Sequence, residues 1–164
     1  MKDIYALSLE YDFKISEYAA HAIGGKYLGK PIGGCQYSDI TVFSFHPVKI
    51  ITTAEGGVAT TNNQQLSEKM ALLRSHGVTR DEDLIERCDG PWYYQQVDLG
   101  FNYRMTDLQG AVGLVQLGKL DAFIDERAKW AKFYQRELAD IPWLQQPTEP
   151  EGGRSGWQAY VMYV

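Results

Sequence analysis

The hydrophobic pattern is clearest between residues 40 and 62. Ile40 to Phe45 is a short run of β-branched and aromatic side chains, which predicts a buried strand. His46-Pro47 ends it, because proline donates no backbone hydrogen bond and restricts the residue before it. Glu55-Gly56-Gly57 predicts a turn, since glycine tolerates positive φ, and Val58 to Thr61 predicts a returning strand. The pattern therefore indicates two strands joined by a short connection.

Apolar residues at helical spacing predict two helices, one at the start of the chain and one after the second strand. Asp3 can cap the first helix, and Asn62 or Asn63 can cap the second, which stops at Gly77. The apolar positions are Ile4, Leu7 and Tyr11 in the first helix and Leu66, Met70 and Leu73 in the second. We expect the second set to be buried as ordinary core.

A third and a fourth helix follow one another. Thr106 opens the third as its cap, and the fourth starts at Leu120. Each interior glycine of a helix costs about 0.5–1 kcal/mol relative to alanine. Gly110, Gly113 and Gly118 therefore indicate close packing, a break near Gly118, or relaxed selection.

Shorter elements complete the pattern. Phe13 to Ser16 predicts a short strand, Gly24 to Gly34 a flexible surface hairpin, and Trp157 to Val164 a final strand. Residues 147–156 and the long polar connection from Arg74 to Tyr94 are predicted as loops.

One lysine lies in the connection between the two main strands. Lys49 is flanked by Val48, Ile50 and Ile51. Removal from water disfavours a charged ammonium and frees the amine as a nucleophile. Such an amine can form a Schiff base with an aldehyde, of which pyridoxal phosphate is the commonest cofactor. A lysine that reaches from a strand end into water is the competing interpretation, and spacing alone favours it.

Three segments resemble the DegT/DnrJ/EryC1/StrS family of sugar aminotransferases. Ser44 to Lys49 (SFHPVK) with Thr52 to Gly57 (TTAEGG) is similar to its cofactor-lysine motif, Glu17 to Gly25 (EYAAHAIGG) to its E-D-A-[AS]-H-A-x-G segment, and Asp98 to Gln109 (DLGFNYRMTDLQ) to its N-Y-R-M block. Arg74 to Asp81 and Gly90 to Tyr94 look most like the pseudaminic-acid branch, whose members aminate a UDP-linked 4-keto-6-deoxy amino sugar. The resemblance covers nearly the whole chain in one register.

The resemblance implies an α/β fold that is part of the aspartate-aminotransferase-like architecture of pyridoxal-phosphate-dependent transferases (fold type I). Residues 1–118 would form the later part of the cofactor-binding large domain, and residues 119–164 the connecting helix and first strand of the small domain. The N-terminal portion of the family, with its Gly-Thr phosphate loop and an aromatic residue that stacks on the cofactor, is expected to be missing from this chain.

The resemblance also implies the site. Lys49 would carry the cofactor, Ser44 would hold its phosphate, and His21 would flank its ring. Asn102 would reach the phosphate of the other subunit in a homodimer. A serine hydroxyl and an asparagine amide are suitable neutral donors to phosphate. From the residues alone, Asn102 also fits a simple turn, and His21 also fits a histidine satisfied by the backbone.

Tyr18 departs from the family motif, which has aspartate at this position. A carboxylate there would keep the pyridine nitrogen of the cofactor protonated, so that the ring accepts electrons. A phenol is neutral at pH 7 and provides no such charge. Glu17 is adjacent, but neighbouring residues of a strand face opposite sides. We therefore predict that Tyr18 weakens or abolishes transamination.

The substrate residues are less closely defined. Trp92, Tyr93 and Tyr94 would form a wall that faces a sugar or nucleotide, or would pack as a lid on the core. Arg104 would hold a substrate phosphate or pair with Asp107. Both pairs of alternatives stay open.

Composition narrows the possible partners. With 164 residues, 45% of them hydrophobic, the chain is long enough for one ordinary domain. A net charge of −5 without a basic cluster argues against nucleic acid and anionic membranes as partners. Cys35 and Cys88 are isolated, so a reducing cytoplasm is the expected location and a metal site is not expected. No apolar run has the length of a signal peptide or a membrane span.

The function implied is pyridoxal-phosphate-dependent transfer of an amino group, with glutamate as the expected donor, to a nucleotide-linked keto sugar. The alternative is an inactive, truncated relative that at most dimerises or binds a ligand. Tyr18, the missing N-terminal portion and the abrupt C-terminal end motivate it. A lectin-like module that uses Trp92, Tyr93 and Tyr94 is a third, weaker alternative.

Overall fold

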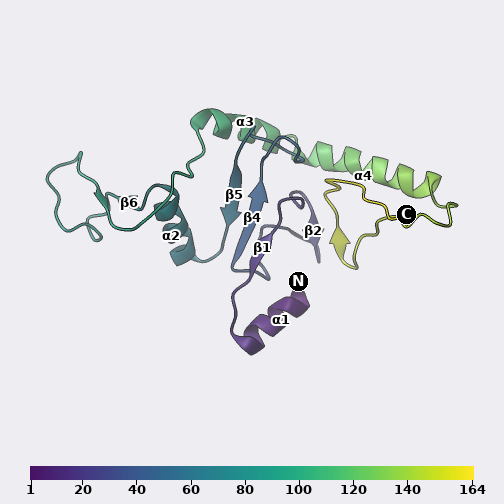
Figure 1. Cartoon of the computed structure of the whole chain (residues 1–164), viewed down its shortest axis with the longest axis horizontal. Helices are drawn as coiled ribbons and strands as arrows, with labels where there is room; N and C mark the ends of the chain where they lie inside the picture. The colour runs from purple at the N-terminus through teal and green to yellow at the C-terminus, as the bar shows by residue number, and fades with distance from the viewer. The chain divides into compact units, whose positions relative to one another are not determined.

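The computed structural model describes residues 1–164 and divides them into two compact units, residues 1–61 with 107–164 and residues 62–106. The first unit contains a three-stranded sheet in the order β1-β4-β5 (Figure 1). Strand β1 (Ser16–Tyr18) pairs in parallel with β4 (Ile40–Ser44), and β4 pairs antiparallel with β5 (Gly57–Thr60). The two strands predicted from the sequence on either side of Lys49 are confirmed.

The predicted strand over residues 13–16 is wrong in its position. Pairing with β4 begins only at Ser16, opposite Ile40. Before it, the Asp39 carboxylate accepts a hydrogen bond from the Ile15 amide at 2.8 Å, and the Ile15 carbonyl accepts from the Asp39 amide at 2.9 Å. The contacts with Asp39, rather than the local apolar pattern, therefore set where the strand starts.

The two faces of the sheet are buried to different extents. Thr41 and Phe43 of β4 are buried on one face, where the Glu17 carboxylate accepts a hydrogen bond from the Thr41 hydroxyl at 3.1 Å. Gly33, at the end of the hairpin over residues 24–34, packs against this face, since a Cβ built there would lie 2.6 Å from the Phe43 ring. Alternate residues of a strand point to opposite faces, so Ile40, Val42 and Ser44 lie on the other face.

The predicted hairpin between residues 24 and 34 is confirmed. Strands β2 (Lys26–Tyr27) and β3 (Lys30–Pro31) are antiparallel and joined by Leu28 and Gly29, with φ values of 48° and 76°. Two positive φ angles in a two-residue loop match the twist of a hairpin. A third strand, β8 (Gly153–Arg154), pairs with β2 inside the segment predicted as loop.

Helix α1 (Lys2–Tyr11) begins two residues earlier than predicted. Met1 occupies the cap position and makes no side-chain capping bond, so Asp3 lies within the first turn and is not the cap. The apolar residues Ile4, Leu7 and Tyr11 are exposed.

Helices α3 (Asp107–Leu117) and α4 (Leu120–Glu137) are separated at Gly118 and Lys119, as predicted. The glycines of α3 have different surroundings. A Cβ on Gly113 would lie 2.9 Å from the Thr53 methyl group, whereas a Cβ on Gly110 would have nothing within 4 Å. Close packing therefore explains Gly113 but not Gly110.

This difference gives a matched pair of substitutions. We expect Gly110→Ala to raise the free energy of unfolding by about 0.5–1 kcal/mol, because alanine favours the helix and meets no neighbour. Gly113→Ala should not show this gain, because its Cβ forces Thr53 to move. Urea unfolding followed by circular dichroism measures both, and equal gains would contradict the packing argument.

The core of the first unit lies between α4 and the segment that carries Lys49. Ile50, Ile51 and Ile124 are 5%, 2% and 2% exposed and form one cluster. The half-buried side chains packed against it are Ile23, Phe45, Leu120 and Phe123.

The predicted final strand over residues 157–164 is wrong. Only Tyr163 makes a ladder contact, an isolated antiparallel bridge with Gln145 whose two hydrogen bonds are 2.9 and 3.1 Å. Trp157 has a φ of 50°, which is incompatible with an extended strand. The Arg127 guanidinium donates to the carbonyls of Trp157 and Gln158, so these groups are not used in a ladder.

The second unit contains α2 (Gln64–Arg74) and the paired strands β6 (Val78–Thr79) and β7 (Gln95–Gln96). Asn63 caps α2, its side chain accepting from the Leu66 amide at 3.1 Å. The predicted stripe of Leu66, Met70 and Leu73 is only half-buried, so it is not ordinary core within this unit. Gly77, with a φ of 67°, lies just beyond the helix end, as predicted.

A salt bridge in this unit joins the Lys69 ammonium on α2 to the Asp98 carboxylate. The hydrogen bond from Lys69 and a second one from the Leu99 amide, at 2.8 Å, hold the pKa of the Asp98 carboxyl below its ordinary value of 3.8. A lowered pKa in the folded state favours folding above the ordinary pKa, and this contribution is lost as the pH falls.

No helix in the chain combines the length and the apolar character that crossing a bilayer requires. The proposed division of the chain at residue 118 into parts of two family domains stays a prediction.

Candidate functional site

Four of the predicted site residues lie at one edge of the β1-β4-β5 sheet. Strands β1 and β4 run in parallel, so their carboxyl ends meet at the same edge (Figure 1). Tyr18 ends β1 and His21 follows it, while Ser44 ends β4 and Lys49 follows it. In open α/β sheets, ligands bind in the crevice beyond the carboxyl ends of parallel strands. The topology thus brings these residues to the edge where a ligand is expected.

Tyr18 and Ser44 also share a face of the sheet. Tyr18 pairs with Val42, and Ser44 is two positions beyond Val42 on the same strand. Paired residues of neighbouring strands and alternate residues of one strand point to the same face. This is the face opposite the one that buries Thr41 and Phe43.

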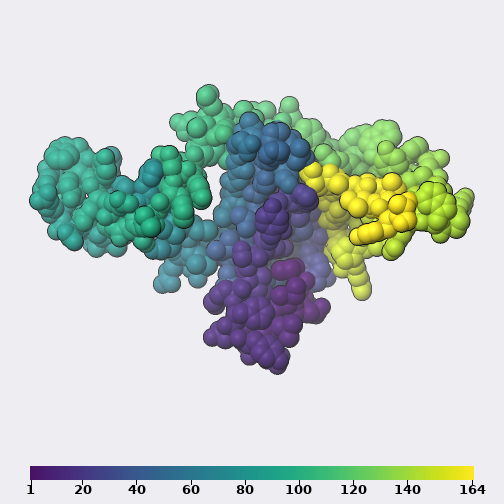
Figure 2. Space-filling model, in the orientation of Figure 1, coloured from purple at the N-terminus to yellow at the C-terminus, as the bar shows by residue number.

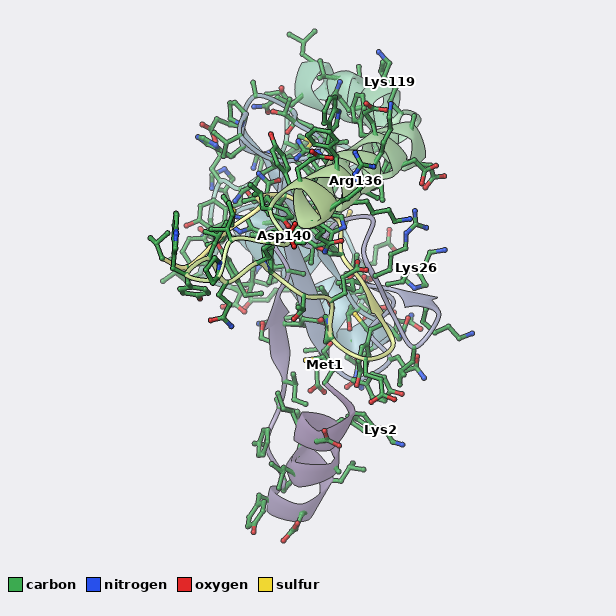
Figure 3. All side chains as sticks on the ribbon, turned by 90° about the vertical axis from the view of Figure 1, so that its right-hand side faces the viewer. Met1, Lys2, Lys26, Lys119, Arg136 and Asp140 are labelled. Carbon is green, nitrogen blue, oxygen red and sulfur yellow. The ribbon has the colours of Figure 1, made fainter.

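Lys49 differs from every other lysine of the chain. The chain contains nine lysines, and eight of them are exposed, whereas Lys49 is half-buried. Lys26 and Lys119, for example, extend outward in Figure 3. Ile50 and Ile51 after it are buried in the core, while Val48 before it is 63% exposed. The expected aliphatic surroundings are therefore found on one side of the lysine.

The backbone around Lys49 forms a tight turn. The Lys49 amide donates to the His46 carbonyl at 2.9 Å, and the Val48 amide donates to Nδ1 of His46 at 3.4 Å. Further along, Thr53 returns to the sheet, its amide donating to the Phe45 carbonyl at 3.0 Å. Proline at position 47 fits this turn because it leaves no amide without a partner.

The Ser44 hydroxyl lies at the start of the same turn. Its oxygen accepts a hydrogen bond from the His46 amide at 3.3 Å. A hydroxyl can accept and donate at once, so its proton is available to a ligand. Ser44 is therefore chemically suited to hold an anionic group beside Lys49.

Tyr18 and His21 present unpaired polar groups at this edge. Tyr18 is 84% exposed and His21 is also exposed, and neither side chain makes a hydrogen bond within the chain. The alternative of a histidine satisfied by the backbone is therefore wrong for His21. Glu17 faces the opposite side and binds the Ser38 and Thr41 hydroxyls, as the strand alternation predicted.

The remaining predicted residues belong to the second unit. Trp92 is 66% exposed and meets the half-buried Tyr93 edge to face, with ring centroids 6.2 Å apart. Asn102 and Arg104 are exposed, and Asn102 pairs with Ser75 in an isolated bridge. The exposure of Trp92 argues against its packing down on a core. The roles predicted for Trp92, Tyr93, Asn102 and Arg104 stay predictions.

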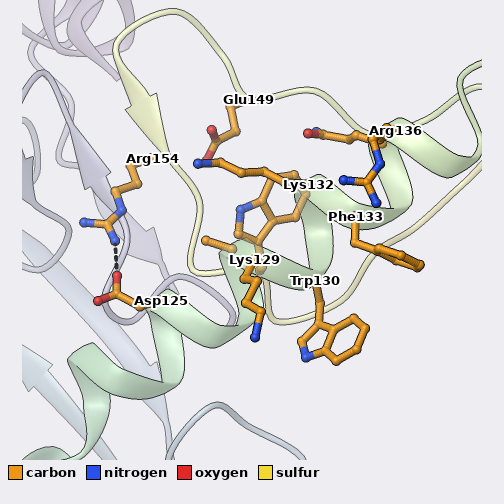
Figure 4. A pocket seen from close by; sticks show the side chains of 11 residues that line it. Asp125, Lys129, Trp130, Lys132, Phe133, Arg136, Glu149 and Arg154 are labelled. Carbon is orange, nitrogen blue, oxygen red and sulfur yellow. Dashed lines mark hydrogen bonds and ion pairs between the residues drawn. The ribbon is translucent and has the colours of Figure 1, made fainter.

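A separate cavity of about 940 Å³ lies along α4, between it and residues 149–157 (Figure 4). Most of its cations already have partners. Arg154 pairs with Asp125 at 2.8 Å, Lys129 pairs with Glu126 at 3.5 Å, and Arg136 pairs with Glu137 at 2.7 Å. Neither Lys49 nor Ser44 lines this cavity, so it is not the predicted cofactor site.

Lys49 and Ser44 fit a pyridoxal-phosphate site in their chemistry, since they offer the amine of a half-buried lysine and a hydroxyl donor. Position 18 does not fit the usual partner of the pyridine nitrogen, because it offers an exposed phenol instead of a carboxylate. The structure shows no cluster of His, Cys, Asp or Glu side chains that could hold a metal ion.

Comparison with known proteins identifies the class to which this chain belongs. The model of the DegT/DnrJ/EryC1/StrS aminotransferase family matches residues 1–164. A UDP-4-amino-4,6-dideoxy-N-acetyl-beta-L-altrosamine transaminase of Campylobacter jejuni is 39% identical over 138 residues, which are 84% of this chain and 34% of that protein.

Solved structures agree with this match. Helicobacter pylori PseC, described as an aminotransferase involved in the biosynthesis of pseudoaminic acid, matches 98% of this chain with 41% of its own, at a TM-score of 0.86 and 30% identity. The PLP form of the putative sugar aminotransferase Spr1654 of Streptococcus pneumoniae matches 92% of this chain with 37% of its own, at a TM-score of 0.79 and 30% identity.

The chain belongs to the DegT/DnrJ/EryC1/StrS aminotransferase family, and its α/β fold is part of the fold of pyridoxal-phosphate-dependent sugar aminotransferases. It spans 42% and 34% of the length of the first two curated relatives it matches. The resemblance predicted from the motifs is confirmed.

Sequence reasoning missed three polar residues that hold the segment around Lys49. Gln116 accepts from the Thr52 amide at 3.4 Å, Gln158 donates to the Val48 carbonyl at 2.6 Å, and Arg127 holds the backbone of Gln158. These contacts join positions 64, 110 and 31 residues apart. No short motif contains them, so no local signal in the sequence indicates them.

Proposed function

We propose that this chain contributes the lysine-bearing part of a pyridoxal-phosphate site for transfer of an amino group to a nucleotide-linked keto sugar. The single observation that supports it most is the placement of Lys49, the one half-buried lysine, beyond the carboxyl ends of β1 and β4. The name of the Campylobacter jejuni relative supports a UDP-linked amino sugar as the kind of substrate. Glutamate as the amino donor and a cytoplasmic homodimer are part of the same proposal.

Each residue has a chemical role in this proposal. Pyridoxal phosphate, when bound, supplies an aldehyde that condenses with amines and a ring that accepts electrons. The Lys49 amine attaches the cofactor and, once released, moves a proton as general base and then general acid. The Ser44 hydroxyl donates to the phosphate, and His21 flanks the ring. In the second unit, Asn102 donates to the phosphate in a homodimer, and Trp92, Tyr93 and Arg104 bind the nucleotide sugar.

Covalent attachment at Lys49 is the direct test. The purified chain is incubated with pyridoxal phosphate, its visible spectrum is recorded, and the adduct is fixed with borohydride. We expect an absorption band that is lost on reduction, and a mass increase on the peptide that contains Lys49. Absence of both would refute the cofactor proposal.

An inactive relative is the second candidate function, and the exposed phenol of Tyr18 favours it. With a neutral group beside the pyridine nitrogen, the chain would attach the cofactor without transferring amino groups. Attachment and transfer are therefore separate properties, and each needs its own measurement.

Substitution of Tyr18 tests the transfer of amino groups. We expect Tyr18→Asp to speed conversion of the cofactor to its amino form by glutamate about a hundredfold, the usual size of one well-placed electrostatic partner. Tyr18→Asn is the matched control, because it has the size of aspartate without its charge. Tyr18 is 84% exposed, so both variants should fold. Equal rates for the two variants would show that charge at position 18 does not limit the reaction.

A further inference from the structure

Residue 48, which precedes the proposed catalytic lysine, is tied to a distant part of the chain. Nε2 of Gln158 donates a hydrogen bond of 2.6 Å to the Val48 carbonyl, across 110 positions of sequence. A carbonyl only accepts, so the nitrogen end of the amide must face Val48. Oε1 of Gln158 is buried and accepts no hydrogen bond from the chain. The contact with Val48 therefore fixes the orientation of this side chain.

The backbone of Gln158 is held in turn by α4. Nη1 of Arg127 donates to the carbonyl of Trp157 at 3.0 Å and to that of Gln158 at 3.3 Å. Arg127 lies three residues after Ile124, whose side chain packs in the same cluster as Ile50. The C-terminal residues (yellow) lie beside α4 in Figure 2.

Residues just before Gln158 pack behind the turn as well. A Cβ on Gly156 would lie 3.0 Å from Cδ1 of Ile50 and 2.7 Å from the Ile23 carbonyl. The C-terminal segment thus meets the Lys49 turn in two ways, by packing at Gly156 and by a hydrogen bond at Gln158.

Apart from Ser44 at the start of the turn, two side chains from distant parts of the chain form hydrogen bonds with residues 46–52. Gln116 accepts from the Thr52 amide at 3.4 Å, and Gln158 donates to the Val48 carbonyl at the much shorter distance of 2.6 Å. Only the second contact involves the peptide group that joins residues 48 and 49. Val48 itself is 63% exposed, so its side chain does little to hold the turn.

We propose that Gln158 is a positioning residue for Lys49. By fixing the peptide that precedes the lysine, its amide sets the direction in which the Lys49 side chain leaves the turn. A fixed direction speeds reaction with a bound aldehyde because less motion has to be arrested on the way to the transition state. The reaction at Lys49 rests on the proposed function, whereas the fixing of the turn does not.

The test compares substitutions of two glutamines with the same kind of contact. Gln158→Leu and the isosteric Gln158→Glu both remove the donor to Val48. Gln146→Leu is the control. Nε2 of Gln146 donates to the carbonyl of Gln135 at 3.2 Å and its Oε1 accepts from the Tyr160 hydroxyl at 2.6 Å, and neither contact reaches residues 46–52. Amide hydrogen exchange at Lys49 reports the turn, with the amides of β4 as internal reference. The rate of borohydride-fixed attachment of pyridoxal phosphate at Lys49 reports the reactivity of the amine.

We expect both Gln158 variants to exchange the Lys49 amide about threefold to tenfold faster, the effect of one hydrogen bond, with β4 unchanged. Attachment at Lys49 should slow by a similar factor, and Gln146→Leu should alter neither quantity. Faster exchange in a chain whose wild type shows no attachment would support the fixing of the turn and refute the proposed function. The inference would be overturned if both Gln158 variants exchanged the Lys49 amide and attached the cofactor at the wild-type rates. It would also be overturned if Gln146→Leu changed these two rates as much as the Gln158 variants do.

Discussion

Lys49→Ala is expected to abolish the visible band and the borohydride-fixed mass increase that pyridoxal phosphate produces at this position. Lys49 is the one half-buried lysine, and it follows β4, whose carboxyl end lies at the edge where we propose that the cofactor binds. The other eight lysines are exposed, and none of them lies in the segment between β4 and β5. The loss should therefore be complete at this site, because no neighbouring amine replaces it.

Lys119→Ala is the control for that experiment, since Lys119 is exposed at the junction of α3 and α4 (Figure 3). It should leave both the band and the mass increase unchanged. A Lys49→Ala variant that still gives the same band, with labelling spread over other lysines, would mean that attachment is nonspecific. The assignment of Lys49 would then be wrong.

Ile124→Ala should lower the free energy of unfolding by about 2–5 kcal/mol, the usual cost of emptying a buried isoleucine site. Ile124 is 2% exposed and packs with Ile50 and Ile51 directly after Lys49. It also lies over Gly24, where a Cβ would come within 2.6 Å of its Cγ1. The close fit leaves little room for collapse around the smaller side chain, so the loss should be near the upper half of the range.

Urea unfolding followed by circular dichroism measures this loss, with Leu114→Ala as control. Leu114 is 74% exposed on α3, and its truncation should change the free energy of unfolding by no more than about 0.5 kcal/mol. Similar values for the two variants would show that the isoleucine cluster is not the core of the first unit. Ile124→Ala should also reduce attachment of pyridoxal phosphate at Lys49, because Ile124 packs against Ile50 and Ile51, which directly follow this lysine.

Elements that depend on neighbours in sequence were predicted well. The strand over residues 40–45, the turn at Gly56 and the return strand follow from residue types within a few positions of one another, and the structure contains β4 and β5 there. The break between α3 and α4 at Gly118 has the same local origin. The three motif segments together identified the family, which the match over residues 1–164 confirms.

Elements that depend on distant partners were predicted poorly. The start of β1 is set by Asp39, and the segment after Trp157 is held by Arg127 instead of by a ladder. The apolar stripe of α2 has the pattern of a core helix, yet it is only half-buried. An apolar pattern shows which residues favour burial but not whether another element is present to bury them.

The sequence by itself determined the family and the aliphatic neighbours of Lys49, because these are properties of residue type and short spacing. Only the tertiary structure decided that Tyr18, His21, Ser44 and Lys49 lie at one edge, since this requires β1 and β4 to pair in parallel across more than twenty residues. The contact from Gln158 to Val48 was likewise settled by folding, because a hydrogen bond between residues 110 positions apart leaves no trace in local spacing.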